Sequence, residues 1–365
     1  MSGPLVTIGV PVYQGQDDLP VTLESLRTQT YPKLDVLISV DAGDQDSAKA
    51  CEPFLRSDGR FRMRIQPSRL GWAENTDWTM RERRGEFYIF QQHDDQVSPT
   101  YVADLVAAAL RASHAAICFA EMQYTGLVNA TDRGFSLRGT PTERVLTFLR
   151  RMECAPLRGL IRSSALASTS GLLLSESDPF ESFGTETRFL AELALWGDFE
   201  FVPGPLYFKR IHGANLHLKR NDWSEDRRRR AWACLCAWMI EVVALAGQTP
   251  VEKRRLFETV LKRFLLPGKR WELLRGPMRR LGQTKAGILR PIRMLLDRLK
   301  SNEEMVRSVT EGWLLYEPES AHDREMFVHL VFTQLKSAAR FDPLGVQSNW
   351  EALELQVQRR FVGQR

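Results

Sequence analysis

The chain has 365 residues, of which 43% are hydrophobic and 26% charged, and its formal net charge is +5. This length allows two domains with sizeable cores, and the composition is that of a soluble globular protein. Five scattered cysteines exclude a disulfide framework and favour a reducing cytoplasm, and the start MSGPLVTIGVPVY has no basic-then-apolar leader pattern.

Strand-like and helix-like segments alternate over the first 120 residues. Leucines at helical spacing separate the β-branched runs, and Ser98 and Pro99 predict the N-cap and first turn of one helix. This alternation indicates an α/β protein with a mostly parallel, doubly wound sheet. The predicted strands are 5–13, 34–40, 61–66, 86–91 and 115–120.

Polar side chains follow three of these strands. Tyr13 follows the first strand, Asp41 the second, and the adjacent pair Asp94 and Asp95 the fourth. In a parallel sheet these strand ends open on one crevice, where ligands bind. The two adjacent carboxylates repel each other, so either solvent, a metal ion or a cationic ligand must compensate them. Their position in the crevice favours a site over a solvated loop.

The pattern of predicted secondary structure changes near residue 216, beyond which the segments are helix-like. We predict a first domain over 1–215 and a helical domain over 216–365. The apolar run 231–247 is too short for a membrane span and contains Glu241, so a buried amphipathic helix is expected, with Cys234 and Cys236 in the core. Thr249 and Glu252 form the pattern of a capping box.

Positive charge is concentrated in residues 251–300, where 15 Lys and Arg residues face four Asp and Glu residues. Three interpretations stay open for this segment. It is a solvated face of helices, a patch that lies on anionic lipid, or a nucleic-acid surface. No nucleic acid is expected as a partner, because no binding module accompanies the charge.

Five segments resemble glycosyltransferase family 2 in their order and spacing, over about residues 4–215. They are VTIGVPVYQG, TLESLRTQTYP, VLISVDAGDQDS, RLGWAENTDWTMRERRGEFYIFQQHDD and TETRFLAELALWGDFEFVPGPLYFKRIHG. The resemblance implies the A-type glycosyltransferase fold and transfer of a sugar from a nucleotide-sugar donor.

The resemblance also implies a divalent metal site. It makes Asp95 a metal ligand and Asp94 the contact to the sugar or ribose, and His212 of FKRIHG completes the metal or diphosphate site. A cation held by carboxylates neutralises the departing diphosphate as a Lewis acid. Oxygen ligands favour Mg²⁺ or Mn²⁺, and an added imidazole favours Mn²⁺.

The nucleotide contacts that the resemblance implies come from several segments. Pro11 and Tyr13 follow the first strand, and Tyr13 is expected to stack on the base. Asp41 is expected to read the base edge, since it is the acid in either register of VDAG. Asn75 is a nucleotide-side contact, and Arg210 is expected to contact the diphosphate.

An inverting transfer needs a base that deprotonates the acceptor hydroxyl. The family takes this base from an acidic motif at the start of a helix, and here Glu186 is the carboxylate at that place, with Glu192 as the weaker candidate. Thr187 stands where the family usually has Asp, and Gln92 stands where it often has another Asp.

The leading hypothesis is a metal-dependent inverting glycosyltransferase. It uses a UDP-, GDP- or dTDP-sugar and a glycan or lipid-linked acceptor in polysaccharide, cell-envelope or glycoconjugate synthesis, in the cytoplasm or at the inner face of the membrane through 251–300. The departures at Ala42, Gln92 and Thr187 keep a non-catalytic sugar-nucleotide or glycan-binding module as the alternative. A nucleotidyltransferase or dehydrogenase is disfavoured, because no glycine-rich phosphate loop follows the first strand.

Overall fold

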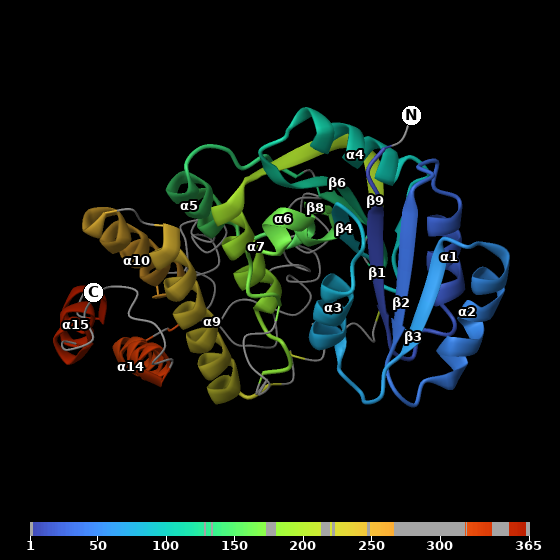
Figure 1. Cartoon of the computed structure of the whole chain (residues 1–365). Coiled ribbons are helices and arrows are strands. Elements are labelled where there is room, and N and C mark those ends of the chain that lie inside the picture. The colour runs from blue at the N-terminus through green and yellow to red at the C-terminus, as the bar shows by residue number, and fades with distance from the viewer. Residues whose placement is uncertain are drawn as a thin grey trace. The chain divides into compact units, whose positions relative to one another are not determined.

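The computed structural model describes residues 3–127, 129–132, 134–172, 180–212, 220, 223–246, 249–265, 318, 320–337 and 350–362. The chain forms two compact units, Met1–Gly213 and Ala214–Arg365 (Figure 1). The sequence-based boundary at residue 215 lies two residues beyond this division.

The first unit is built on a nine-stranded sheet, counted over the described residues. Its strand order is β3-β2-β1-β4-β8-β6-β9-β5, and β7 pairs with β6. Strands β1–β4, β6 and β9 run in one direction and β5, β7 and β8 run against them, which confirms the mostly parallel α/β sheet. The strands are β1 Val6–Val12, β2 Leu34–Val40, β3 Phe61–Ile65, β4 Phe87–Phe90, β5 Gln96–Val97, β6 Ala115–Gly126, β7 Ala130–Asp132, β8 Leu160–Arg162 and β9 Asp198–Ile211.

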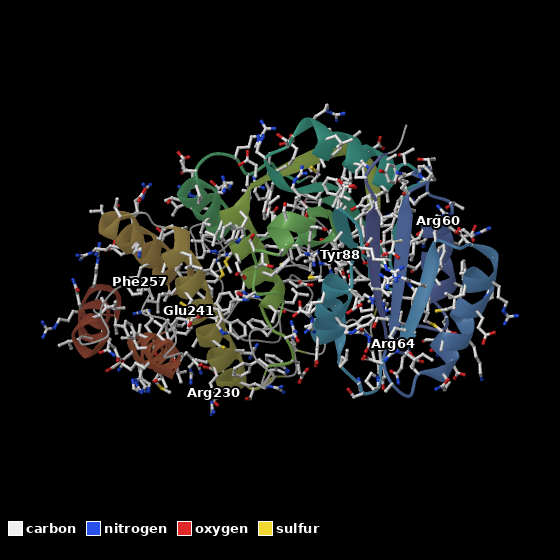
Figure 2. All side chains as sticks on the ribbon, viewed as in Figure 1. Arg60, Arg64, Tyr88, Arg230, Glu241 and Phe257 are labelled. Atoms are coloured by element: carbon white, nitrogen blue, oxygen red, sulfur yellow. The ribbon has the colours of Figure 1, made fainter. Side chains whose placement is uncertain are left out.

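Helices α1 (Leu19–Arg27) and α2 (Gln45–Ser57) lie on one side of β1–β3, and α3 (Trp72–Arg81) lies on the other (Figure 1). Helix α3 approaches the sheet closely because Gly9 has no side chain. A Cβ there would clash with the hydroxyls of Thr79 and of Tyr88, which is labelled in Figure 2. These two hydroxyls are hydrogen-bonded at 2.7 Å. The close packing places the start of α3 beside the carboxyl ends of β1 and β2.

The helix predicted to begin at Ser98 begins later. Helix α4 spans Tyr101–Arg111, and Thr100 is its N-cap without a side-chain cap. The Ser98 hydroxyl instead accepts a hydrogen bond from the Leu206 N–H at 3.1 Å. Ser98 therefore continues the pairing of β5 with β9, and the prediction of an N-cap at Ser98 was wrong.

The second half of the first unit contains the secondary-structure elements that were least predictable from the sequence. Strand β6 runs six residues beyond the predicted end at 120, because it pairs with β9 as far as Gly126. The helical elements here are α5 Pro141–Arg151, the 3₁₀ helix η1 Ala155–Arg158, α6 Ser163–Leu166 and α7 Thr185–Trp196. Helix α7 and strand β9 carry the last site segments of the first unit.

The second unit is helical in its described residues, as predicted. Helix α9 is buried around more of its circumference than the amphipathic helix expected from the sequence, and Cys234 and Cys236 are in the core. The Thr249–Glu252 capping box is confirmed by reciprocal bonds of 3.2 and 3.0 Å. Residues 266–300 of the basic segment lie outside the described residues. The elements are α9 Glu225–Ala246, α10 Pro250–Leu265, α14 Ala321–Ser337, α15 Trp350–Val357 and the terminal π-helical turn η3 Gln358–Val362.

Within the described part of the chain, no helix combines the length and the apolar character that a membrane crossing requires.

Candidate active site

Short hydrogen bonds hold the carboxyl ends of β1, β2 and β4 together. The Gln14 N–H donates to Asp44 Oδ2 at 2.6 Å, which joins the segment after β1 to the segment after β2. The Thr22 hydroxyl donates to the His93 carbonyl at 2.7 Å, which joins α1 to the acidic segment after β4. The strand ends therefore meet at one edge of the sheet, as the sequence predicted.

Asp95 is the buried member of the acidic pair, with 1% of its surface exposed. Its Oδ1 accepts from the Arg210 N–H at 2.8 Å, and its Oδ2 accepts from the Tyr207 hydroxyl at 2.9 Å. Burial raises the pKa of the Asp95 carboxyl, and the charge of Asp94 adds to this effect, while Lys209 opposes it. Asp95 thus anchors strand β9 to the acidic segment.

Asp94 is the member of the pair that meets His212. The distance from Asp94 Oδ2 to His212 Nε2 is 2.9 Å, and both side chains are partly exposed. Burial alone would raise the pKa of Asp94, but His93, Lys209 and the bond to His212 together lower it. The resemblance implied Asp95 and His212 as metal ligands, and in the structure His212 is hydrogen-bonded to Asp94.

Two cationic side chains converge on one amide oxygen beside the acidic pair. Gln92 Oε1 accepts from Lys209 Nζ at 2.7 Å and from the Arg158 guanidinium at 2.8 Å. Lys209 Nζ also lies 3.9 Å from Asp95 Oδ2. Burial lowers the pKa of Lys209, and the positive charge of Arg158 lowers it further.

Glu186 lies in the first turn of α7, where the sequence placed it. Its Oε1 is 3.4 Å from Arg158, and its side chain is 20% exposed. Thr187 is fully buried and lies 3.5 Å from the Cys154 thiol, whose pKa burial raises to about 12. Position 186 therefore faces the cationic cluster, whereas position 187 faces the core.

The weaker candidate, Glu192, is committed to structural contacts. Its Oε1 accepts from the N–H and hydroxyl of Ser170 at 2.9 and 2.8 Å, and its Oε2 accepts from Arg188 at 2.7 Å. Since Glu192 is 6% exposed and both of its oxygens accept hydrogen bonds, the geometry favours Glu186 as the carboxylate open to a substrate.

Asp41 and Asn75, two expected nucleotide contacts, are hydrogen-bonded to each other. Asp41 Oδ1 accepts from Asn75 Nδ2 and from the Leu70 N–H, and Oδ2 accepts from the Gly71 N–H, each at 3.1 Å. Asp41 is buried, so its first effect is to hold the loop that leads into α3. This role was not predictable from the sequence, because two of the groups that Asp41 holds are backbone N–H groups of the loop before α3, and a residue pattern does not reveal them.

Tyr13 and Pro11, the two contacts expected at the end of β1, lie in different surroundings. The Arg69 guanidinium lies over the Tyr13 ring, 3.9 Å from its centre, so an arginine now covers part of the expected base platform. Pro11 is buried in β1. It is tolerated there because β4 pairs with β1 only as far as Gly9, so the nitrogen of Pro11 lies beyond that ladder.

Arg210 divides its groups between two carboxylates. Its N–H holds Asp95, and its guanidinium forms an ion pair with Asp18, while the side chain stays 45% exposed. A diphosphate contact by Arg210 would therefore compete with Asp18.

A cavity of about 710 Å³ opens between β3 and α3, away from the acidic pair. It includes Leu70 and Glu74 near the Asp41 loop, but none of Asp94, Glu186 and His212 lines it.

The site fits a divalent cation whose coordination shell is completed by a bound substrate. Within the described ranges, no group of three or more His, Cys, Asp and Glu side chains forms a closed metal cage. Asp94 and His212 nevertheless offer one carboxylate and one imidazole at 2.9 Å, and small divalent ions are usually bound by one or two carboxylates together with substrate phosphates. The donor set is suitable for Mn²⁺ or Mg²⁺.

Sequence reasoning missed three residues of the cluster. Tyr207 and Lys209 are two residues apart on β9, share one face of the strand and both reach Asp95, so this spacing was the available signal. Arg158 offered no such signal, because it lies in a 3₁₀ turn far from every recognised motif.

Comparison with known proteins shows which family this chain is similar to. Residues 7–167 match the model of glycosyl transferase family 2. "Putative glycosyltransferase EpsH" of Bacillus subtilis strain 168 is 28% identical over 230 residues, or 59% of this chain and 63% of EpsH. The alignment thus spans just under two thirds of that relative. These comparisons support a family 2 glycosyltransferase, and the matched residues 7–167 lie within the first unit.

Solved structures agree on the fold. TarS residues 1–349 of S. aureus, in complex with UDP, has a TM-score of 0.56 at 12% identity and covers 98% of this chain and 90% of its own. Mannosyltransferase PcManGT of Pyrobaculum calidifontis, with GDP-Man and Mn²⁺, has a TM-score of 0.52 at 14% identity, with coverages of 92% and 88%. The first unit has the A-type glycosyltransferase fold.

Proposed function

We propose that this chain is an inverting glycosyltransferase that moves a sugar from a nucleotide-sugar donor to a hydroxyl of a glycan or lipid-linked acceptor. The observation that carries the proposal is the meeting, at one edge of the sheet, of the Asp94–His212 pair and the Glu186–Arg158 pair. Such a site offers a place for a diphosphate and a carboxylate for a hydroxyl. The UDP, UDP-GlcNAc and GDP-Man named for neighbours of similar fold support a nucleotide-sugar donor.

Asp94 and His212 would hold a divalent cation, Mn²⁺ or Mg²⁺, and Asp95 would support them from behind. The ion supplies Lewis-acid neutralisation of the departing diphosphate. Asp95 contributes by fixing the Arg210 backbone and the Tyr207 hydroxyl, which sets the position of the strand that leads to His212. Mn²⁺ in one neighbour of the same fold supports this part of the proposal.

The remaining residues bind and orient the substrates. Tyr13 and Pro11 would border the base, and Asp41 would act with Asn75 by shaping the loop before α3. Arg210 would contact the diphosphate after release from Asp18. Glu186 would take the proton of the acceptor hydroxyl, since its side chain is partly exposed and lies on a helix start, which favours a negative charge.

The proposed location is the cytoplasm, with contact to the inner face of the membrane through residues 251–300. In the described portion of this segment, α10 carries Lys253, Arg254 and Arg255 in its first turns. Positive side chains of this kind are attracted to anionic lipid. Co-sedimentation with vesicles of neutral and of anionic lipid tests this part separately from catalysis.

A two-stage experiment tests the function. Thermal shifts with UDP, GDP and dTDP, each with and without Mn²⁺, identify the base and the metal dependence. Hydrolysis or transfer from the matching sugar nucleotides, with anomeric configuration followed by NMR, then tests turnover and inversion. Binding without turnover on any donor and acceptor would support the non-catalytic module, and retention of configuration would contradict the inverting mechanism.

A further inference from the structure

Arg158 joins two segments of the site that are far apart in the chain. Its guanidinium donates to Gln92 Oε1 at 2.8 Å in the acidic segment and lies 3.4 Å from Glu186 Oε1 on α7. Its own backbone is fixed as well, because the Tyr101 hydroxyl donates to the Arg158 carbonyl at 2.8 Å. With 5% of its surface exposed, Arg158 has little freedom to move.

The partners of Arg158 differ in charge, and this difference decides where its charge acts. Gln92 offers a neutral amide oxygen, which accepts hydrogen bonds from Arg158 and Lys209 without cancelling either charge. In the part of the chain that the structure describes, Glu186 is the carboxylate that lies within hydrogen-bonding range of Arg158. A carboxylate at position 92 would compete with Glu186 for the same guanidinium.

The environment favours a charged Arg158 despite its burial. Burial alone lowers the pKa of a guanidinium, but Glu186, Tyr207 and Asp95 raise that of Arg158 above its ordinary value. Arg158 therefore stays protonated and provides a fixed positive charge against the carboxylate of Glu186.

We propose that Arg158 is the positioning residue for Glu186, and that Gln92 is the neutral anchor which leaves the Arg158 charge to that carboxylate. The inference rests on the proposed function, because it assigns to Glu186 the role of base. The sequence departs from the family at Gln92. Under this proposal, Gln92 is part of a functional site, and the departure does not indicate a loss of activity. Orientation of this kind matters because a displacement of about 1 Å can lower a rate by about 10²-fold.

The first test replaces Arg158 in the full-length chain. Arg158→Met removes the charge, and Arg158→Lys keeps it on a flexible stem without the planar fork. We expect kcat for transfer to fall by about 10- to 100-fold in Arg158→Met and by less in Arg158→Lys, with donor Kd within about twofold of the parent. Arg158→Lys also serves if Arg158→Met does not fold.

Arg144 provides a matched control. It is buried to a similar degree, and its guanidinium donates to the carbonyls of Ala194 and Leu195 at 2.7 and 2.9 Å and faces Asp198 at 3.3 Å. Arg144→Lys should lower the midpoint of thermal unfolding and leave kcat of the folded protein unchanged. An equal loss of kcat in Arg144→Lys would mean that any buried-arginine change lowers the rate, and would overturn the proposal.

Gln92→Glu tests the anchor. Glutamate keeps the size of glutamine and can accept both hydrogen bonds, but it draws the Arg158 charge away from Glu186. We expect kcat to fall by about tenfold with donor Kd little changed. A loss confined to donor Kd, or parental kcat in the Arg158 variants, would overturn the proposal while leaving the glycosyltransferase function in place. A parent chain that neither transfers nor hydrolyses any sugar nucleotide would overturn both.

Discussion

The Nε2 atom of His212 lies 2.9 Å from Oδ2 of Asp94, although 118 residues separate them in the chain. The contact forms because β9 is tied to the acidic segment by Asp95, whose two oxygens hold the Arg210 N–H and the Tyr207 hydroxyl. The acidic pair is thus divided in role: Asp95 sets the position of the strand, and Asp94 presents a carboxylate beside the imidazole.

Asp94→Asn should remove most of the Mn²⁺-dependent binding of nucleoside diphosphate, because it deletes the charged oxygen ligand that lies beside His212. The midpoint of thermal unfolding should change little, since Asp94 is partly exposed. Calorimetric titration with Mn²⁺ and UDP or GDP measures the effect. Asp46→Asn, at an exposed carboxylate of α2, is the control and should bind as the parent does. Parental Mn²⁺ affinity in Asp94→Asn would show that the cation binds elsewhere.

Asp41→Asn should lower the free energy of unfolding by about 1–3 kcal/mol, because an amide NH₂ would face N–H donors that now point at a carboxylate oxygen. Nucleotide affinity should fall as well, since the loop before α3 loses its anchor. Urea unfolding followed by circular dichroism measures the free energy of unfolding. A variant with parental stability and lost nucleotide affinity would mean that Asp41 contacts the base directly.

Tyr13→Ala should weaken nucleoside diphosphate binding by about tenfold, since stacking of a base on an aromatic ring contributes about 1–3 kcal/mol. Tyr13→Phe keeps the ring and should bind as the parent does. Arg69→Ala removes the guanidinium that lies over Tyr13, and so tests whether this arginine and the base compete for the same ring. Fluorescence titration with a labelled nucleotide compares the three variants. Parental affinity in Tyr13→Ala would place the base away from this ring.

Glu186→Gln should lower the transfer rate by about 10²- to 10⁴-fold, because glutamine keeps the shape of the side chain and cannot take a proton. Donor affinity should stay near the parental value, since the base contacts the acceptor. Glu192→Gln is the contrast: it disrupts the buried pair with Arg188 and should lower stability by about 3–5 kcal/mol. Near-parental transfer in Glu186→Gln would move the base to another group, and a matching loss of donor affinity would place Glu186 in the donor pocket.

A chain truncated after Lys219 should bind nucleoside diphosphate as the full chain does, because every site residue discussed above lies in Met1–Gly213. Gel filtration and thermal shift with nucleotide and Mn²⁺ test this. A folded fragment without nucleotide binding would show that residues of the second unit complete the site, and an insoluble fragment would show that the first unit needs the second in order to fold.

The parts of the fold that were predictable have local signals. Strands β1, β2 and β4 are apolar runs that end in polar residues, so their meeting at one edge followed from the parallel arrangement. The short strand β8 has no comparable signal, because its three residues depend on pairing with β4 and β6. Ser98 shows how tertiary structure overrides a local pattern, since its hydroxyl bonds to β9 and caps no helix.

The candidate site was predictable to the same extent. Asp94, Asp95, Glu186 and His212 stand in recognisable segments, but the partner that each meets depends on long-range packing. Position 187 is buried while position 186 faces Arg158, and this follows from the rotation of α7 against the core, which a motif comparison cannot resolve.

Strand β9 changes register along its length. Val202 pairs with Ala120 and Leu206 with Glu121, so residues 203–205 have no partner on β6, and Gly204 adopts a φ of +112° that favours glycine. Beyond this bulge, pairing of Tyr207 and Phe208 with β5 locks the register of the last segment. Insertions or deletions at 203–205 can be absorbed without changing the core or the site. An insertion or deletion of one residue between Leu206 and Tyr207 would turn both Tyr207 and Lys209 to the opposite face. Natural length variation in β9 should therefore be confined to the bulge.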